Sequence, residues 1–116
     1  MQARNLVWYR VADREEEIPL ATNGIAQMEV EGRCFCMARY EGRWHAFAWK
    51  CPHAGGLFSE GHIDGAGNVV CPVHRYRFRL SNGWNSSGEG FKLRTYAVES
   101  REDGIYVGFP QELPGF

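Results

Sequence analysis

Two short segments of the sequence each pair a cysteine with a histidine. The first, CPHAGG, has Cys51 and His53 two positions apart, and the second, CPVHRYRF, has Cys71 and His74 three positions apart. Seventeen residues separate His53 from Cys71. Thiolates and imidazoles are the ligands that zinc and iron–sulfur centres prefer. These four residues are therefore candidate metal ligands.

The division of the four residues between two loops helps to distinguish a zinc site from an iron–sulfur centre. Zinc fingers and ribbons mostly have knuckles in which two thiolates share one tight turn. Here each loop supplies one thiolate and one imidazole. If both cysteines bind one metal and both histidines bind another, each loop bridges two metals. That arrangement is the ligand set of a Rieske [2Fe-2S] centre.

The two segments also resemble the cluster-binding loops of Rieske proteins, and the flanking Pro52, Gly55 and Pro72 agree with that pattern. The resemblance extends over roughly residues 45–109. It implies one [2Fe-2S] cluster for the chain. The ligands that it implies are Cys51, His53, Cys71 and His74.

The resemblance further implies a fold, namely an antiparallel β base into which a small cluster-binding subdomain is inserted. In this chain the insertion would be residues 45–90, and the whole of residues 1–116 would form one Rieske domain. A chain of 116 residues fits one domain and leaves little room for two.

Two departures separate this chain from the Rieske proteins of respiratory and photosynthetic membrane complexes. That branch has a further cysteine in each loop, and the two form a disulfide, whereas this chain has Gly56 and Val73 at the matching positions. The branch also has hydroxyl groups that donate hydrogen bonds to sulfur, at positions taken here by Tyr76 and Phe78. Fewer hydrogen bonds to sulfur lower the reduction potential. The chain thus resembles the soluble, low-potential Rieske ferredoxins.

The remaining sequence predicts an all-β fold, an antiparallel sandwich or small barrel. Short alternating segments are separated by Gly and Asn turns, and no long amphipathic helix is evident. The expected strands are 6–11, 25–30, 34–40, 44–49, 68–71, 76–80, 92–99 and 105–109.

Composition excludes several classes of partner. The net charge of −1 provides no basic field for nucleic acid. No apolar stretch approaches the roughly 18 residues of a membrane span, and the first residues do not resemble a signal peptide. We expect a cytoplasmic protein whose cysteines are not used for disulfides. The alternation in RCFCMARY places Cys34 and Cys36 on one strand face, where we expect buried free thiols.

Electron transfer is the function that this set of residues favours. The loops contain no nucleophile or general base placed for substrate chemistry, and a cluster with four protein ligands has no open coordination site. We therefore expect a one-electron carrier between a reductase and a terminal redox enzyme such as an oxygenase, without a small-molecule substrate, rather than an enzyme. Two alternatives stay open. They are the small subunit of an assimilatory NAD(P)H nitrite reductase and an interaction module with a structural zinc ion.

Several other polar residues have less specific roles. Arg75, Arg77 and Arg79 alternate in RYRFR and would share one strand face, either as a docking patch for an acidic partner or as an ordinary solvated face. His45 and His62 are most simply structural or surface histidines. The segment 88–91 lies where many Rieske proteins have a proline-containing third loop, and we expect it to cover the site although it has no proline.

Overall fold

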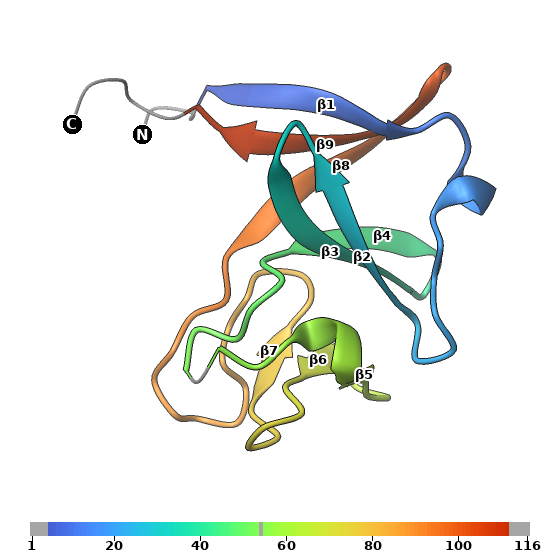
Figure 1. The fold of residues 1–116 in the computed structure, drawn as a ribbon. Coiled ribbons are helices and arrows are strands. Elements are labelled where there is room, and N and C mark those ends of the chain that lie inside the picture. Colours follow the sequence, from blue (N-terminus) through green and yellow to red (C-terminus); the bar gives the residue numbers. More distant parts are fainter. Residues whose placement is uncertain (1–4, 54, 112–116) are drawn as a thin grey trace.

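The strands of this protein are antiparallel and form two sheets, as Figure 1 shows for the computed structural model, which describes residues 5–53 and 55–111. The larger sheet has the strand order β1-β9-β8-β4-β3-β2, and the smaller one has the order β5-β6-β7. The strands of the larger sheet are β1 (Leu6–Ala12), β2 (Ile25–Val30), β3 (Arg33–Tyr40), β4 (Arg43–Phe47), β8 (Thr95–Arg101) and β9 (Gly104–Pro110). Those of the smaller sheet are β5 (His62–Ile63), β6 (Asn68–Val70) and β7 (Arg77–Arg79), and two single-turn 3-10 helices are η1 (Glu15–Glu17) and η2 (Phe58–Glu60).

Two tight turns of the same kind connect β2 to β3 and β3 to β4. Each has the sequence Glu-Gly, and both residues of each turn have positive φ: 49° and 77° at Glu31 and Gly32, and 51° and 78° at Glu41 and Gly42. Two-residue hairpins favour this geometry because its twist matches that of the flanking strands. The turns therefore set the register of the β2–β3–β4 meander.

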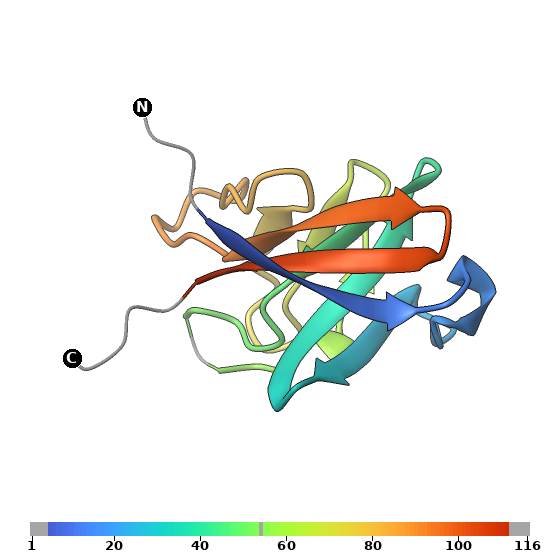
Figure 2. The ribbon, with the colours of Figure 1, turned by 90° about the horizontal axis from the view of Figure 1, so that it is seen from above.

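The larger sheet folds over on itself, so that β1, β9 and β8 cross above β2, β3 and β4 (Figure 2). Only two residue pairs join β4 to β8, and the sheet bends at this short ladder. Between the two halves lies a core that includes Phe35, Met37, Val107 and Phe109. This bent sheet is the antiparallel base that the sequence predicts.

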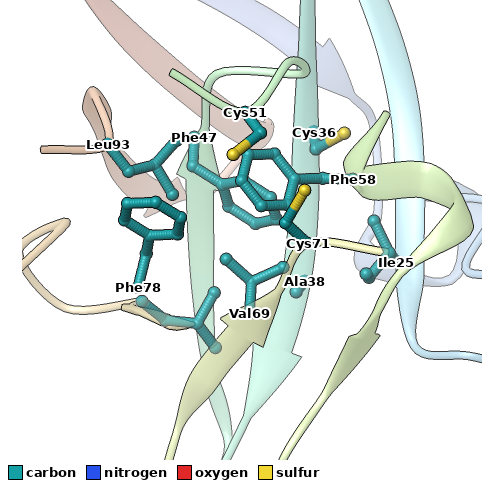
Figure 3. Packing of buried hydrophobic residues seen from close by; sticks show 11 residues of the cluster. Ile25, Cys36, Ala38, Phe47, Cys51, Phe58, Val69, Cys71, Phe78 and Leu93 are labelled. Atoms are coloured by element: carbon teal, nitrogen blue, oxygen red, sulfur yellow. The ribbon is translucent and has the colours of Figure 1, made fainter. Parts of the chain in front are cut away.

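The smaller sheet packs against the other face of the meander through a second core. At its centre, the buried ring of Phe58 from η2 contacts Phe47 of β4 and Phe78 of β7, with ring centroids 5.8 and 5.9 Å apart. Both contacts are edge-to-face, which is a favourable arrangement for aromatic pairs. Figure 3 shows these rings with the sulfur atoms of Cys51 and Cys71 in the same cluster.

Most predicted strands are confirmed to within three residues at each end. The smaller sheet lies between β4 and β8 in the sequence, as expected for an insertion, and all of it falls within residues 45–90. The limits of that segment stay a prediction. Strand β5 and helix η2 were not predicted, because two or three residues are too few to show a periodicity. Among the described residues, no helix has the length and apolar character needed to cross a bilayer.

The cysteines of β3 are only partly as expected. Cys36 is fully buried, whereas Cys34 is half-buried, so the prediction of two buried thiols is wrong for Cys34. Burial raises the pKa of the Cys36 thiol to about 12, and the nearby Cys34 contributes to the shift. Cys36 is therefore an apolar core residue at neutral pH.

Removal of the Phe58 ring should destabilise the protein, because this ring joins the two sheets. We expect Phe58→Ala to lower the free energy of unfolding by about 3–5 kcal/mol. Urea denaturation followed by tryptophan fluorescence measures this change. The control is Leu20→Ala, which removes an exposed side chain and should change stability by less than about 0.5 kcal/mol. A loss at Phe58 no larger than that of the control would contradict this role.

Candidate metal centre

The first candidate ligand loop is closed by two main-chain hydrogen bonds. The Cys51 amide donates to the carbonyl of Gly56 at 2.8 Å, and the Gly55 amide donates to the carbonyl of Cys51 at 3.0 Å. Gly55 has a φ of 70°, in the left-handed region that glycine adopts without steric cost. A tight loop thus begins and ends at the Cys51 backbone.

The second loop repeats this pattern of hydrogen bonds residue for residue. The Cys71 amide donates to the carbonyl of Tyr76 at 2.9 Å, and the Arg75 amide donates to the carbonyl of Cys71 at 2.9 Å. Arg75 has a φ of 61° and takes the position that Gly55 has in the first loop. A non-glycine residue costs roughly 1–2 kcal/mol in this conformation. The surrounding hydrogen bonds hold it there, so the two loops are closed by the same hydrogen bonds although their sequences differ.

Both cysteine side chains point into the core. Cys51 and Cys71 are 3% and 1% exposed, and Figure 3 shows both sulfur atoms beside the Phe58 ring. The loops are also close to each other, because a Cβ atom built on Gly56 would lie 2.9 Å from the Cys71 sulfur. The absence of a side chain at Gly56 lets the first loop approach the second thiol.

Both histidine side chains lie at the outer end of the loops. The Nδ1 atoms of His53 and His74 face each other at 3.4 Å. A tetrahedral ion with metal–nitrogen bonds of about 2.0–2.1 Å would hold two nitrogen atoms about 3.4 Å apart. The separation of the two rings thus fits a single metal ion bound by both Nδ1 atoms. His74 is exposed and His53 is half-buried, so this end of the site reaches the surface.

The four residues comprise two buried thiols and two imidazoles at the outer end of the site. Among residues 5–53 and 55–111, no group of three or more His, Cys, Asp or Glu side chains is placed to hold a single ion. A structural zinc site needs three or four such ligands around one ion. Two buried thiols and two outer imidazoles instead match a donor set with two ligands for each of two irons. The site residues therefore fit a [2Fe-2S] cluster.

Aromatic rings enclose His53 on two sides. Tyr76 lies with its ring centroid 4.4 Å from that of His53, and Phe91 lies 5.1 Å from it. Figure 1 shows the third loop, which contains Phe91, beside the first ligand loop. The contact of Phe91 with His53 supports the expectation that residues 88–91 cover the site, although the segment has no proline.

A buried asparagine organises the third loop. The side-chain amide of Asn85 donates to the carbonyl of Arg77 at 3.0 Å, and its oxygen accepts the Phe91 amide at 3.2 Å. The same amide donates to the carboxylate of Glu89 at 2.9 Å. A hydrogen bond from Ser87 is the largest cause that lowers the pKa of Glu89. Asn85 was not singled out from the sequence, because the segment NSSGEG resembles an ordinary polar loop.

The positions that would form a disulfide in the membrane branch are adjacent in this structure. A Cβ atom on Gly56 would lie 3.5 Å from the Cβ of Val73, within the range of disulfide-linked residues. The structure therefore agrees with the sequence comparison that places Gly56 and Val73 at the positions of the two disulfide cysteines. In this chain, the contact is between a glycine backbone and an exposed valine.

Other residues considered from the sequence lie elsewhere. The expectation that Arg75, Arg77 and Arg79 share one strand face is wrong for Arg75, because β7 begins at Arg77. Arg77 forms an ion pair with Asp64 at 3.2 Å. His62 is exposed on β5, and His45 is half-buried on β4. Among the tryptophans, Trp44 and Trp49 are partly buried against the two cores, whereas Trp84 is 63% exposed.

Comparison with known proteins agrees with this geometry. The model of the Rieske [2Fe-2S] domain matches residues 7–96. The "Alkene monooxygenase system, ferredoxin component" of Xanthobacter autotrophicus is 25% identical over 72 residues, which cover 62% of this chain and 59% of that protein. The chain therefore spans about three-fifths of the length of this relative. The "Nitrite reductase [NAD(P)H]" of Emericella nidulans is 33% identical over 81 residues, which cover 62% of this chain but only 7% of that protein.

Solved structures with the same fold include a complex of two redox proteins. A chain from "Complex of reduced oxygenase and oxidized ferredoxin in carbazole 1,9a-dioxygenase" superposes with a TM-score of 0.75 and 25% identity. The superposition covers 94% of this chain and 99% of that chain. With the family model matching most of the sequence and the donor set fitting its cofactor, the chain belongs to the Rieske [2Fe-2S] domain family and has one [2Fe-2S] cluster as its cofactor.

Proposed function

We propose that this protein is a one-electron carrier that passes electrons from a reductase to a terminal oxygenase. The observation that carries the proposal is the pair of imidazoles, 3.4 Å apart between their Nδ1 atoms, at the surface end of a site whose thiols are buried. The names of two similar proteins, a ferredoxin component of an alkene monooxygenase system and a ferredoxin–oxygenase complex, support the choice of an oxygenase as acceptor.

In this proposal the cysteines and histidines have separate tasks. Cys51 and Cys71 would hold the inner iron as thiolates, and His53 and His74 would hold the outer iron through Nδ1. When bound, a Rieske cluster accepts and releases a single electron at a time. Matching hydrogen bonds close both loops, and we expect them to limit the rearrangement that accompanies the change in charge. The exposed His74 would be a point of contact between the site and a partner.

The residues around His74 form the surface that a partner would contact. Val73 is 48% exposed and Phe91 is 37% exposed, so apolar side chains adjoin the histidine end of the site. Arg75 and Lys92 are exposed cations next to them in sequence. An apolar centre with positive charges at its edge fits a partner surface with acidic residues around an apolar patch. The cation patch proposed for docking would then include Arg75 but exclude Arg77, which is paired with Asp64.

A low reduction potential and a cytoplasmic location are also part of the proposal. Phe78 is fully buried and has no hydroxyl to donate to the cluster sulfurs, which supports a low potential. Cys34 and Cys36 are free thiols although Cys34 is accessible, and a reducing compartment preserves such thiols.

The second candidate is the small subunit of an assimilatory nitrite reductase. The 33% identity with a segment of nitrite reductase [NAD(P)H] favours it, and its acceptor would be another redox centre of the same enzyme. The structural zinc module is the third candidate, and the metal content of the protein distinguishes it from the other two.

The purified protein should be reddish-brown and contain about two iron atoms and two labile sulfides per chain. On reduction it should give a rhombic EPR signal whose average g lies below that of ferredoxins with four cysteine ligands. Metal and sulfide analysis, together with EPR, checks both expectations. A colourless protein with one zinc ion per chain would exclude the carrier and support the zinc module.

Replacement of one histidine ligand by cysteine should lower the reduction potential. In His74→Cys a thiolate donates more negative charge to the outer iron than an imidazole does, and therefore disfavours the added electron. Protein-film voltammetry measures the shift in variants that retain the visible spectrum of the cluster. His62→Cys is the matched control, because His62 lies on β5 outside the loops, and its potential should match that of the parent. A potential for His74→Cys equal to or above that of the parent would refute histidine ligation.

Electron delivery distinguishes the two redox candidates. The dithionite-reduced protein should be reoxidised rapidly by a Rieske-type oxygenase with its substrate bound, and slowly by a sirohaem nitrite reductase. Stopped-flow absorbance of the cluster band reports both rates at the same ionic strength. Rapid reoxidation by the nitrite reductase alone would reverse the assignment.

A further inference from the structure

A polar hollow of about 400 Å³ lies at the junction of the two sheets, outside the ligand loops. One wall comes from the β3–β4 hairpin, with Tyr40, Glu41, Arg43 and His45, and the other comes from the β5–β6 turn and the end of β7 with Arg79. Small-molecule sites in proteins have volumes of about 300–1,000 Å³. The hollow is therefore large enough for a small ligand.

Hydrogen bonds across the junction hold the walls of this hollow in place. The Tyr40 hydroxyl donates to the carbonyl of Gly65 at 2.8 Å, and the His45 ring donates to the backbone of Leu80. Burial is the largest cause that lowers the pKa of His45, so this ring is neutral near pH 7 and adds no positive charge. The hollow is thus a preformed feature of the fold.

Two guanidinium groups line the hollow without an acidic partner. Several other arginines of the described residues form ion pairs, for example Arg39 with Glu15 at 2.7 Å and Arg101 with Glu99 at 2.8 Å. In the part of the chain that the structure describes, neither Arg43 nor Arg79 has a carboxylate within 4.0 Å of its guanidinium. They come from different sheets, so the fold brings two positive charges without an ion pair to one concave surface, which Glu41 also lines.

Such a surface favours a compact anion with several oxygen atoms. Guanidinium groups bind phosphate oxygens with two parallel hydrogen bonds, and a dianion relieves the repulsion between two nearby cations. The Ser81 hydroxyl on the lining adds a neutral donor, and Glu41 is the only carboxylate among the lining residues. We propose that this hollow binds a phosphate group, either inorganic phosphate or the phosphate of a small metabolite, between Arg43 and Arg79.

An NMR titration of the cluster-loaded protein tests this site without reference to electron transfer. Sodium phosphate should shift the amide signals of residues 40–45 and 79–81 in a saturable manner, and sodium chloride at equal ionic strength should not. Titration with a nucleoside monophosphate distinguishes the two sources of phosphate, because an organic ligand should bind more tightly than inorganic phosphate if its other groups contact the hollow.

Substitutions that each remove one charge provide the decisive comparison. Arg43→Gln and Arg79→Gln should each weaken phosphate binding by about tenfold or more, since each removes a charged hydrogen-bond donor. Glu41→Gln should strengthen binding, because it removes the opposing carboxylate. Arg14→Gln, at an exposed arginine outside the hollow, is the matched control and should leave the affinity unchanged. The proposal is overturned if phosphate shifts no more than chloride does, or if Arg79→Gln and Glu41→Gln both bind phosphate as the parent does.

Discussion

The site depends on a change from a buried to a surface position within two or three residues of the chain. In each ligand loop a thiol must lie in the core and an imidazole must reach the surface. The loops achieve this with one pattern of hydrogen bonds, which returns the chain to the amide of the cysteine after five residues. Because the amide and the carbonyl of each cysteine are both bonded within the loop, neither group requires water. The polarity of the site, with thiols inside and imidazoles outside, follows from this geometry.

The rest of the molecule supports the loops from two sides. Behind the thiols, Phe58 joins the meander to the smaller sheet, and this apolar cluster excludes water from the sulfur atoms. In front, Asn85 ties the third loop to β7 and directs Phe91 toward His53. Phe58 is apolar and Asn85 is polar, yet both side chains are buried. Phe58 contacts the rings of Phe47 and Phe78, and Asn85 accepts a hydrogen bond from the Phe91 amide. The loops are thus held between a packed core and a hydrogen-bonded loop.

The candidate ligands and the all-β base could be predicted from the sequence because both have strong local signals. The C-x-H and C-x-x-H spacings are specific, and alternation over five or more residues identified most strands. The elements that escaped prediction have weak signals. Strand β5 has two residues, and the role of Asn85 depends on partners at Arg77 and Phe91, which are six or more residues away. The left-handed conformation of Arg75 was also unforeseen, since arginine does not favour it. The alternating pattern predicted that Arg75, Arg77 and Arg79 share one strand face. Arg75 instead lies in the second ligand loop, before β7 begins at Arg77.

The short ladder between β4 and β8 has a consequence for the evolution of this architecture. All three strands of the smaller sheet and both ligand loops are encoded in one continuous stretch, which leaves the base at β4 and returns at the paired strand β8. A segment whose two ends emerge side by side can be lengthened, shortened or exchanged while the strand order of its host is preserved. Such changes must preserve the core that the insertion shares with the base, because Phe58 packs on Phe47 of β4.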